Sequence, residues 1–254
     1  MSARHLAYML TAFGAALSLA PAPVQAEPRA VVELFTSQGC SSCPAADKLL
    51  AEFTKDPSLI ALSLSVDYWD YLGWKDTLAL AGHTKRQQAY AKSRGDREVY
   101  TPQMVINGMQ HVLGSDKAAI ERAVTQTRRQ ATVLTVPVTL AVSNGKVTVN
   151  VNSSKDDRGT AEVWLCPITS LATVMVERGE NRGNTMAYHN VVRRWLKVGN
   201  WTGKAESWTV PVADFSNDKD GVPIDAIDSI AVVVQGGVST SPGVMLGAAM
   251  MPLR

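Results

Sequence analysis

Two closely spaced cysteines are the residues of this sequence with the clearest chemistry. Cys40 and Cys43 enclose two serines, and Pro44 follows at once. An apolar, β-branched run at residues 30–36 precedes them, and a helical pattern at residues 44–55 follows. At a helix N-terminus Cys40 meets unpaired N–H groups and the positive end of the helix dipole, which favour its thiolate. One helical turn further on, Cys43 is close enough to resolve a mixed disulfide.

Glu33 is the only acid in the strand that leads to these cysteines. If it is buried, its pKa rises. If it lies at an edge, it faces solvent. The two serines between the cysteines supply no cation to stabilise a thiolate, so a structural disulfide is the alternative to a reactive one.

Four other residues invite a chemical interpretation. Cys166 follows an apolar run and is predicted to be a free core cysteine, with a disulfide to a partner as the minor alternative. His83, His111 and His189 are far apart in the sequence. One of them could complete a copper or zinc site with the cysteine pair, but nothing in the spacing demands it.

Two further groups have both a simple and a functional interpretation. Aromatic residues are concentrated at residues 68–74, where they either pack an insertion or line a wall for apolar substrate segments. The polar, glycine-bearing segment 181–189 is typical of a loop, which is either a solvated turn or a binding element.

Length and composition limit the class of protein. The chain has 254 residues, 25 Lys and Arg against 23 Asp and Glu, a net charge of +2 and 46% hydrophobic residues. This length allows one large or two small domains with a substantial core. The near-neutral balance excludes a polybasic nucleic-acid binder, and 3 cysteines are too few for a disulfide-stapled scaffold.

Residues 1–26 have the pattern of a secretory signal peptide. A short basic start at Arg4 and His5 precedes an apolar run at residues 6–20, and Val24 and Ala26 are small residues at the −3 and −1 positions. Cleavage after Ala26 predicts a secreted or periplasmic protein that is not transmembrane after cleavage. A retained anchor is the alternative, but about 15 apolar residues fall short of the ~20 that span a bilayer.

The first half of the mature chain alternates strands with helices. Strands are expected at residues 30–36 and 59–66, and helices at 44–55, 76–94 and 115–129, with Gly95 and Ser115 as caps. An Asn-Gly turn at residues 107–108 predicts a hairpin, because this pair tolerates the positive φ angles that a two-residue turn needs. The order predicts a compact α/β layer architecture.

From about residue 132 the pattern is mostly strand. Expected strands lie at residues 136–142, 146–151, 163–166, 172–176, 191–197, 205–210 and 229–234. Their spacing predicts a small β-sandwich or an added antiparallel sheet.

Several motifs resemble those of a secreted bacterial family catalogued as domain of unknown function 1223, and more broadly those of the thioredoxin superfamily. The similarity is carried by VELFTSQGCSSCP (32–44), VDYWD (66–70), GWKD (73–76), YTPQMVING (100–108), GENRG (179–183) and YHNVV (188–192). It covers nearly all the mature chain. The resemblance implies an α/β class with a thioredoxin-like domain at residues 27–131 and a β-rich, sandwich-like C-terminal extension at 132–254.

The superfamily resemblance gives Glu33 and Pro102 roles. Thioredoxins carry a buried acid in the first strand that takes the proton from the second cysteine, and Glu33 is the only acid in the matching strand. Thioredoxin-like proteins hold a cis-proline just before the hairpin strand and against the cysteine pair, and Pro102 matches it by position. The cis bond would leave the Thr101 backbone open to pair with an extended substrate strand near Cys40. An ordinary trans proline at the start of a strand is the alternative.

These features predict a thiol–disulfide oxidoreductase that acts on protein substrates. Cys40 exchanges with the substrate, Cys43 resolves the mixed disulfide, Thr101 and Pro102 shape the docking surface, and Glu33 shuttles the proton. No small-molecule cofactor is needed, because the pair holds two electrons, and a redox partner protein recycles it. A binding or assembly protein with a structural disulfide, and a copper or zinc carrier, are the alternatives.

Overall fold

The computed structural model describes residues 28–156, 159–215 and 223–253 of the chain. The predicted signal peptide, residues 1–26, lies outside these ranges, and its cleavage stays a prediction. No helix in the described ranges is long and apolar enough to cross a bilayer.

The first half of the described chain contains all three α-helices and four strands. In chain order these are β1 (Ala30–Thr36), α1 (Cys43–Phe53), β2 (Leu59–Ser65), α2 (Ala81–Arg94), β3 (Gln103–Ile106), β4 (Gln110–Leu113) and α3 (Lys117–Arg128). A short 3-10 turn, η1 (Asp70–Leu72), lies between β2 and α2. Every residue of β1 and β2 is buried, as expected for strands covered on both faces.

The second half of the described chain consists of strands and two short 3-10 turns. The strands are β5 (Val138–Ser143), β6 (Lys146–Val151), β7 (Ala161–Met175), β8 (Thr185–Val192), β9 (Leu196–Trp201), β10 (Glu206–Pro211), β11 (Ser229–Val238) and β12 (Ser241–Pro252). The turns are η2 (Val212–Phe215) and η3 (Ile224–Ala226).

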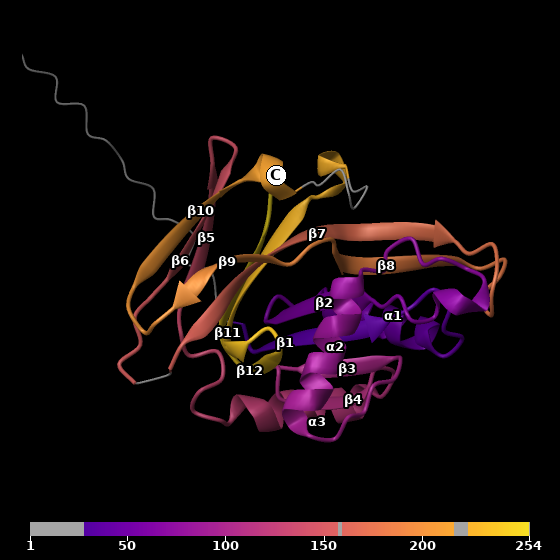
Figure 1. Cartoon of the computed structure of the whole chain (residues 1–254), viewed down its shortest axis with the longest axis horizontal. Coiled ribbons are helices and arrows are strands. Elements are labelled where there is room, and N and C mark those ends of the chain that lie inside the picture. The colour runs from indigo at the N-terminus through magenta and orange to yellow at the C-terminus, as the bar shows by residue number, and fades with distance from the viewer. Residues whose placement is uncertain (1–27, 157–158, 216–222, 254) are drawn as a thin grey trace, which may run out of the picture.

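One large mixed sheet runs through both halves of the molecule (Figure 1). Its strand order is β12-β11-β7-β8-β2-β1-β3-β4, and β9 also pairs with β7. The two halves join where β2 runs parallel to β8, at the pair Ser63 and Val191. A smaller sheet has the order β10-β6-β5. The chain therefore has a mixed α/β fold with a large mixed sheet and few helices.

The two faces of the N-terminal strands pack against different helices. Val32 and Leu34 lie in one cluster with residues of α1 and α3. Val31 and Phe35 point the other way, into a cluster that contains Tyr90 of α2 and residues of β11 and β12. This alternation follows from the two-residue repeat of a strand, and it places Glu33 on the α2 face.

Several predicted elements differ from the structure. The helix expected at residues 76–94 begins at Ala81, and the last helix begins at Lys117 with Asp116 as its cap, because the Asp116 carboxylate accepts the Ala119 N–H. The strands expected at 163–166 and 172–176 are one 15-residue strand, β7. The strand expected at 191–197 divides between β8 and β9, and β12 was not predicted.

The division into domains at residues 131 and 132 stays a prediction. The small sheet packs its valines on β7, β11 and β12, and forms a second layer over that part of the large sheet. The large sheet itself continues from one predicted domain into the other.

Candidate functional site

A disulfide joins Cys40 and Cys43 where β1 leads into α1. The helix begins at Cys43 and has Pro44 in its first turn, as the motif predicted. Cys40 lies in the tight turn just before the helix, where its carbonyl accepts the Cys43 N–H at 3.2 Å. The pair therefore occupies the N-terminal end of α1.

The protein covers both sulfur-bearing residues. Cys40 is 1% exposed and Cys43 is fully buried, whereas Ser41 and Ser42 between them face solvent. Attack on the disulfide from outside therefore requires a local opening of this loop.

The peptide bond between Thr101 and Pro102 is cis, and it precedes β3, whose Gln103 pairs with Phe35 near the end of β1. The Trp69 indole N–H donates to the Thr101 hydroxyl at 2.8 Å. The Trp69 Cβ packs so closely on Gly39 that a Cβ there would lie 3.0 Å away. The aromatic segment at 68–74 thus contributes Trp69, which lies between the residue before Cys40 and the residue before Pro102.

Gly114 fills the space between Pro102 and α1. A Cβ at this position would lie 3.1 Å from the Pro102 Cβ and 3.3 Å from the Ala46 Cβ. Only the missing side chain of glycine allows this close approach. Pro102 is thereby packed near the first turns of α1.

The loop between β7 and β8 braces the disulfide loop from a distant part of the sequence. The Asn181 side-chain amide donates to the carbonyls of Gln38 and Cys40, both at 2.9 Å, and is 4% exposed. The Glu180 carboxylate accepts the Ser41 N–H at 3.1 Å. The Asn181 side chain is therefore buried against the disulfide loop, although residues 182–185 of the same segment face solvent. No spacing in the sequence connects Asn181 with a cysteine about 140 residues away.

Two buried carboxyl groups, those of Asp76 and Asp47, lie next to the disulfide loop and the first turns of α1. No sequence pattern predicted a role for either of them. Asp76 accepts the N–H groups of Gln38 and Leu78, each at 2.8 Å, and burial raises its pKa to about 6 despite these bonds. Burial raises the pKa of Asp47 to about 8, and the charge of the neighbouring Asp76 carboxylate adds to the rise. Neither Asp47 oxygen has a hydrogen-bond partner within the described residues.

Asp47 follows Cys43 by four residues on the same buried face of α1. Side chains with this spacing are neighbours on a helix. A cavity of about 440 Å³ lies between this part of α1 and β8, and its lining includes Pro44, Asp47, Met186 and His189. The arrangement places a buried carboxyl group with a raised pKa one helical turn from the second cysteine.

Glu33 lies on the other face of β1. It is fully buried, so the interpretation that it faces solvent is wrong. Its two oxygens accept the Arg86 guanidinium and the Tyr90 hydroxyl, each at 2.6 Å. Of the five predicted site residues, Cys40 and Cys43 are joined by the disulfide, and Thr101 is linked to their loop through Trp69. Pro102 packs near the first turns of α1, and Glu33 lies on the opposite face of β1.

The remaining candidate residues are separated. Cys166 is buried and free, as predicted, and burial raises the pKa of its thiol well above the ordinary range. His83 is buried against the Ser65 carbonyl, and His111 contacts Tyr100. The ranges that the structure describes contain no cluster of three or more His, Cys, Asp or Glu side chains suited to a metal ion.

Fold and site together define a mixed α/β protein with a covered disulfide at a strand-to-helix junction. The family model described as "Protein of unknown function (DUF1223)" matches residues 31–235, and the chain belongs to this family. A crystal structure of a protein from Agrobacterium tumefaciens is similar, with 32% sequence identity and a TM-score of 0.77. The match covers 91% of this chain and 96% of that one. No curated protein matches the chain.

Proposed function

We propose that this protein is a secreted or periplasmic thiol–disulfide oxidoreductase built on a thioredoxin-like domain, residues 27–131, with a β-rich extension, residues 132–254. One observation supports the proposal: the Cys40–Cys43 disulfide lies at the start of α1, and Trp69 contacts both Gly39 just before it and Thr101 of the cis Thr101–Pro102 bond. Its substrates are protein thiols and disulfides, and a redox partner protein recycles it.

In the oxidising direction a substrate thiolate attacks the Cys40 sulfur and the Cys40–Cys43 bond breaks. Cys43 leaves with the electron pair and takes a proton from Asp47. A second substrate thiol then releases its proton to solvent, from which Asp47 regains one, and the new thiolate displaces Cys40. Cys40 leaves with the electron pair and takes up the proton that the first substrate thiol released, so that the substrate becomes a disulfide and the cysteine pair a dithiol. Two electrons and two protons have moved, and the reverse sequence reduces a substrate.

Asp47 fits the proton-transfer role that the resemblance to thioredoxins gave to Glu33. Its pKa of about 8 keeps it largely protonated at neutral pH, ready to supply a proton to the leaving Cys43. It lies one helical turn from Cys43, whereas Glu33 is engaged by Arg86 across the sheet.

Access to Cys40 requires the covering residues to move. Asn181 and Glu180 hold the loop through three hydrogen bonds to its backbone, which a substrate strand can replace when it pairs with Thr101. Trp69 then forms one wall of the docking surface. Opening a few hydrogen bonds at a loop costs far less than global unfolding.

Trapping tests the proposal. The Cys43→Ser variant is expected to accumulate mixed disulfides between Cys40 and envelope proteins, seen on non-reducing gels and released by reductant. The matched control, Cys40→Ser with Cys43→Ser, retains only the buried Cys166 and should trap nothing. Absence of adducts, together with no dithiol activity in the natural protein, would overturn the proposal.

The burial of Cys40 and Cys43 favours one second candidate, a binding or assembly protein with a structural disulfide. Equilibration in redox buffers separates the two. A reduction potential below about −300 mV supports the structural role, and a potential above it supports exchange.

A further inference from the structure

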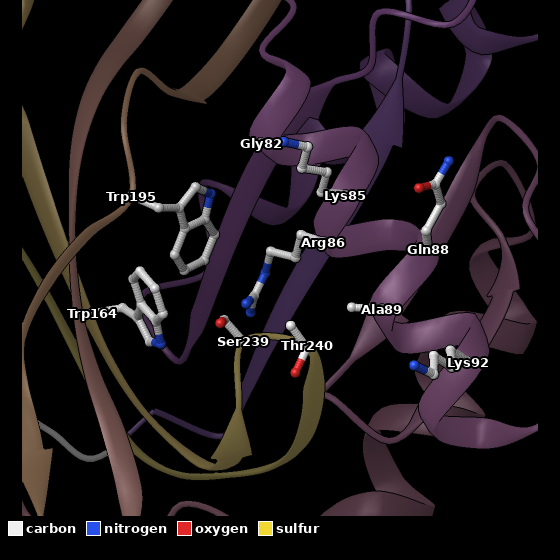
Figure 2. A pocket seen from close by; sticks show the side chains of 10 residues that line it. All are labelled: Gly82, Lys85, Arg86, Gln88, Ala89, Lys92, Trp164, Trp195, Ser239 and Thr240. Atoms are coloured by element: carbon white, nitrogen blue, oxygen red, sulfur yellow. The ribbon is translucent and has the colours of Figure 1, made fainter.

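A second cavity lies on the other side of the N-terminal strands from the disulfide. It has a volume of about 530 Å³ and is bounded by α2, by Trp164 and Trp195 from the C-terminal half, and by the turn between β11 and β12 (Figure 2). This volume is in the range of sites that bind small molecules, roughly 300–1,000 Å³. Nothing in the proposed exchange reaction uses this cavity.

One wall of the cavity is aromatic and already ordered. The rings of Trp164 and Trp195 pack edge to face with centroids 6.2 Å apart. The Arg86 guanidinium stacks 4.0 Å from the Trp195 centroid, and Figure 2 shows it reaching from α2 towards the two indoles. Tyr90 and Gln235 hydrogen-bond the same guanidinium, so its position does not depend on a ligand.

The charge of the cavity is positive. Arg86 is neutralised by Glu33. Lys85 and Lys92, seven residues apart on α2, also line the cavity, and within the described ranges neither forms an ion pair. The lining residues include no acid, while Ser239 and Thr240 bring hydroxyl groups.

We propose that this cavity binds a small organic anion with a flat aromatic body. The indoles offer stacking and edge contacts to an apolar ring. Lys85 and Lys92 lie at the two ends of this stretch of α2 (Figure 2), so that either lysine favours a carboxylate or sulfonate at its end of the cavity. The hydroxyl groups of Ser239 and Thr240 offer hydrogen bonds. Both recognition elements are in place before binding, which lowers the ordering cost of the complex.

Two probes with the same ring system test the proposal in the full mature chain. The anion 1-anilinonaphthalene-8-sulfonate carries the sulfonate, and neutral N-phenyl-1-naphthylamine lacks it. We expect saturable 1:1 binding of the anion by fluorescence titration, about tenfold tighter than binding of the neutral probe, and weaker at high salt.

The variants locate the binding. The double change Lys85→Gln and Lys92→Gln should weaken anion binding about five- to tenfold, and Thr240→Trp, at an exposed turn, should block the cavity. Lys146→Gln with Lys204→Gln removes the same charge from exposed positions elsewhere and should leave binding unchanged. Unsaturable binding, equal affinity for the two probes, or full affinity in the Lys85 and Lys92 variant would overturn the proposal.

Discussion

Buried carboxyl groups lie on both faces of the N-terminal strands, but their hydrogen-bond and ion-pair partners differ between the two faces. On the α2 face, Glu33 is held by Arg86 and Tyr90. On the α1 face, Asp47 has no hydrogen-bond partner within the described residues, and burial raises its pKa to about 8. Glu33 is buried together with a cation that compensates its charge, whereas burial without a cation raises the pKa of Asp47 towards neutral pH.

The largest expected effect comes from removing the cation on the α2 face. Arg86→Met leaves Glu33 buried without its cation, and we expect a loss of about 3–5 kcal/mol in the free energy of unfolding, measured with urea. Adding Glu33→Gln should recover much of this loss. Lys85→Met removes a neighbouring exposed charge and should change stability little, so an equal loss there would refute the comparison.

The acid on the α1 face is expected to make stability depend on pH. The folded protein raises the pKa of Asp47 from 3.8 to about 8, so the folded state favours the protonated form. This contribution is fully present below pH 3.8 and is lost as pH rises towards 8. The raised pKa of Asp76 also stabilises the folded protein at low pH, and this contribution is lost as pH rises towards about 6.

Asp47→Asn should therefore flatten the pH dependence of unfolding between pH 6 and 8 by roughly 1–2 kcal/mol. Urea titrations at both pH values measure this difference. The matched control is Asp225→Asn, at an exposed position, which should keep the natural slope. A slope that Asp47→Asn does not change would assign the titration to another group.

A third test removes the Asn181 side chain that holds the disulfide loop, without changing the net charge of the protein. Asn181→Ala leaves the carbonyls of Gln38 and Cys40 without this donor, and we expect a loss of about 1–2 kcal/mol and faster reduction of the disulfide by dithiothreitol. Asn184→Ala, exposed in the same loop, is the control. Equal reduction rates in the two variants would show that Asn181 does not limit access.

The smallest expected effect concerns charge at the disulfide loop. The Glu180 carboxylate accepts the N–H of Ser41, so its negative charge lies next to Cys40. This charge repels the negative charge that develops on the Cys40 sulfur when the disulfide is reduced. Glu180→Gln should make the couple more oxidising by about 10 mV, since an exposed charge acts weakly. Equilibration with glutathione measures the shift, and Glu177→Gln in the same loop is the control.

Local patterns predicted the elements that hold the cysteine pair. The apolar run of β1, the helical spacing of α1 and the Asn-Gly turn before β4 depend on neighbouring residues, so the sequence contains their signal. The cis bond at Pro102 was also predicted, although through resemblance to a family and not through spacing.

Contacts between distant segments were not predictable in this way. Asn181 meets the disulfide loop only because β8 joins β2 in the sheet. Asp47 is an ordinary polar position of a helix until α1 packs against β8 and excludes solvent. The strand β12, rich in glycine and alanine, lacks the β-branched pattern of a strand, and its pairing with β11 stabilises it instead.

The junction of β2 with β8 makes the two halves interdependent. If the chain were divided after residue 131, the first fragment would lose the amide that braces Cys40 and expose the edge of β2. Any free energy that the β7–β8 hairpin gains or loses when the disulfide is reduced must appear, by thermodynamic linkage, in the reduction potential. The hairpin thus affects the reduction potential of the cysteine pair although it contains neither cysteine.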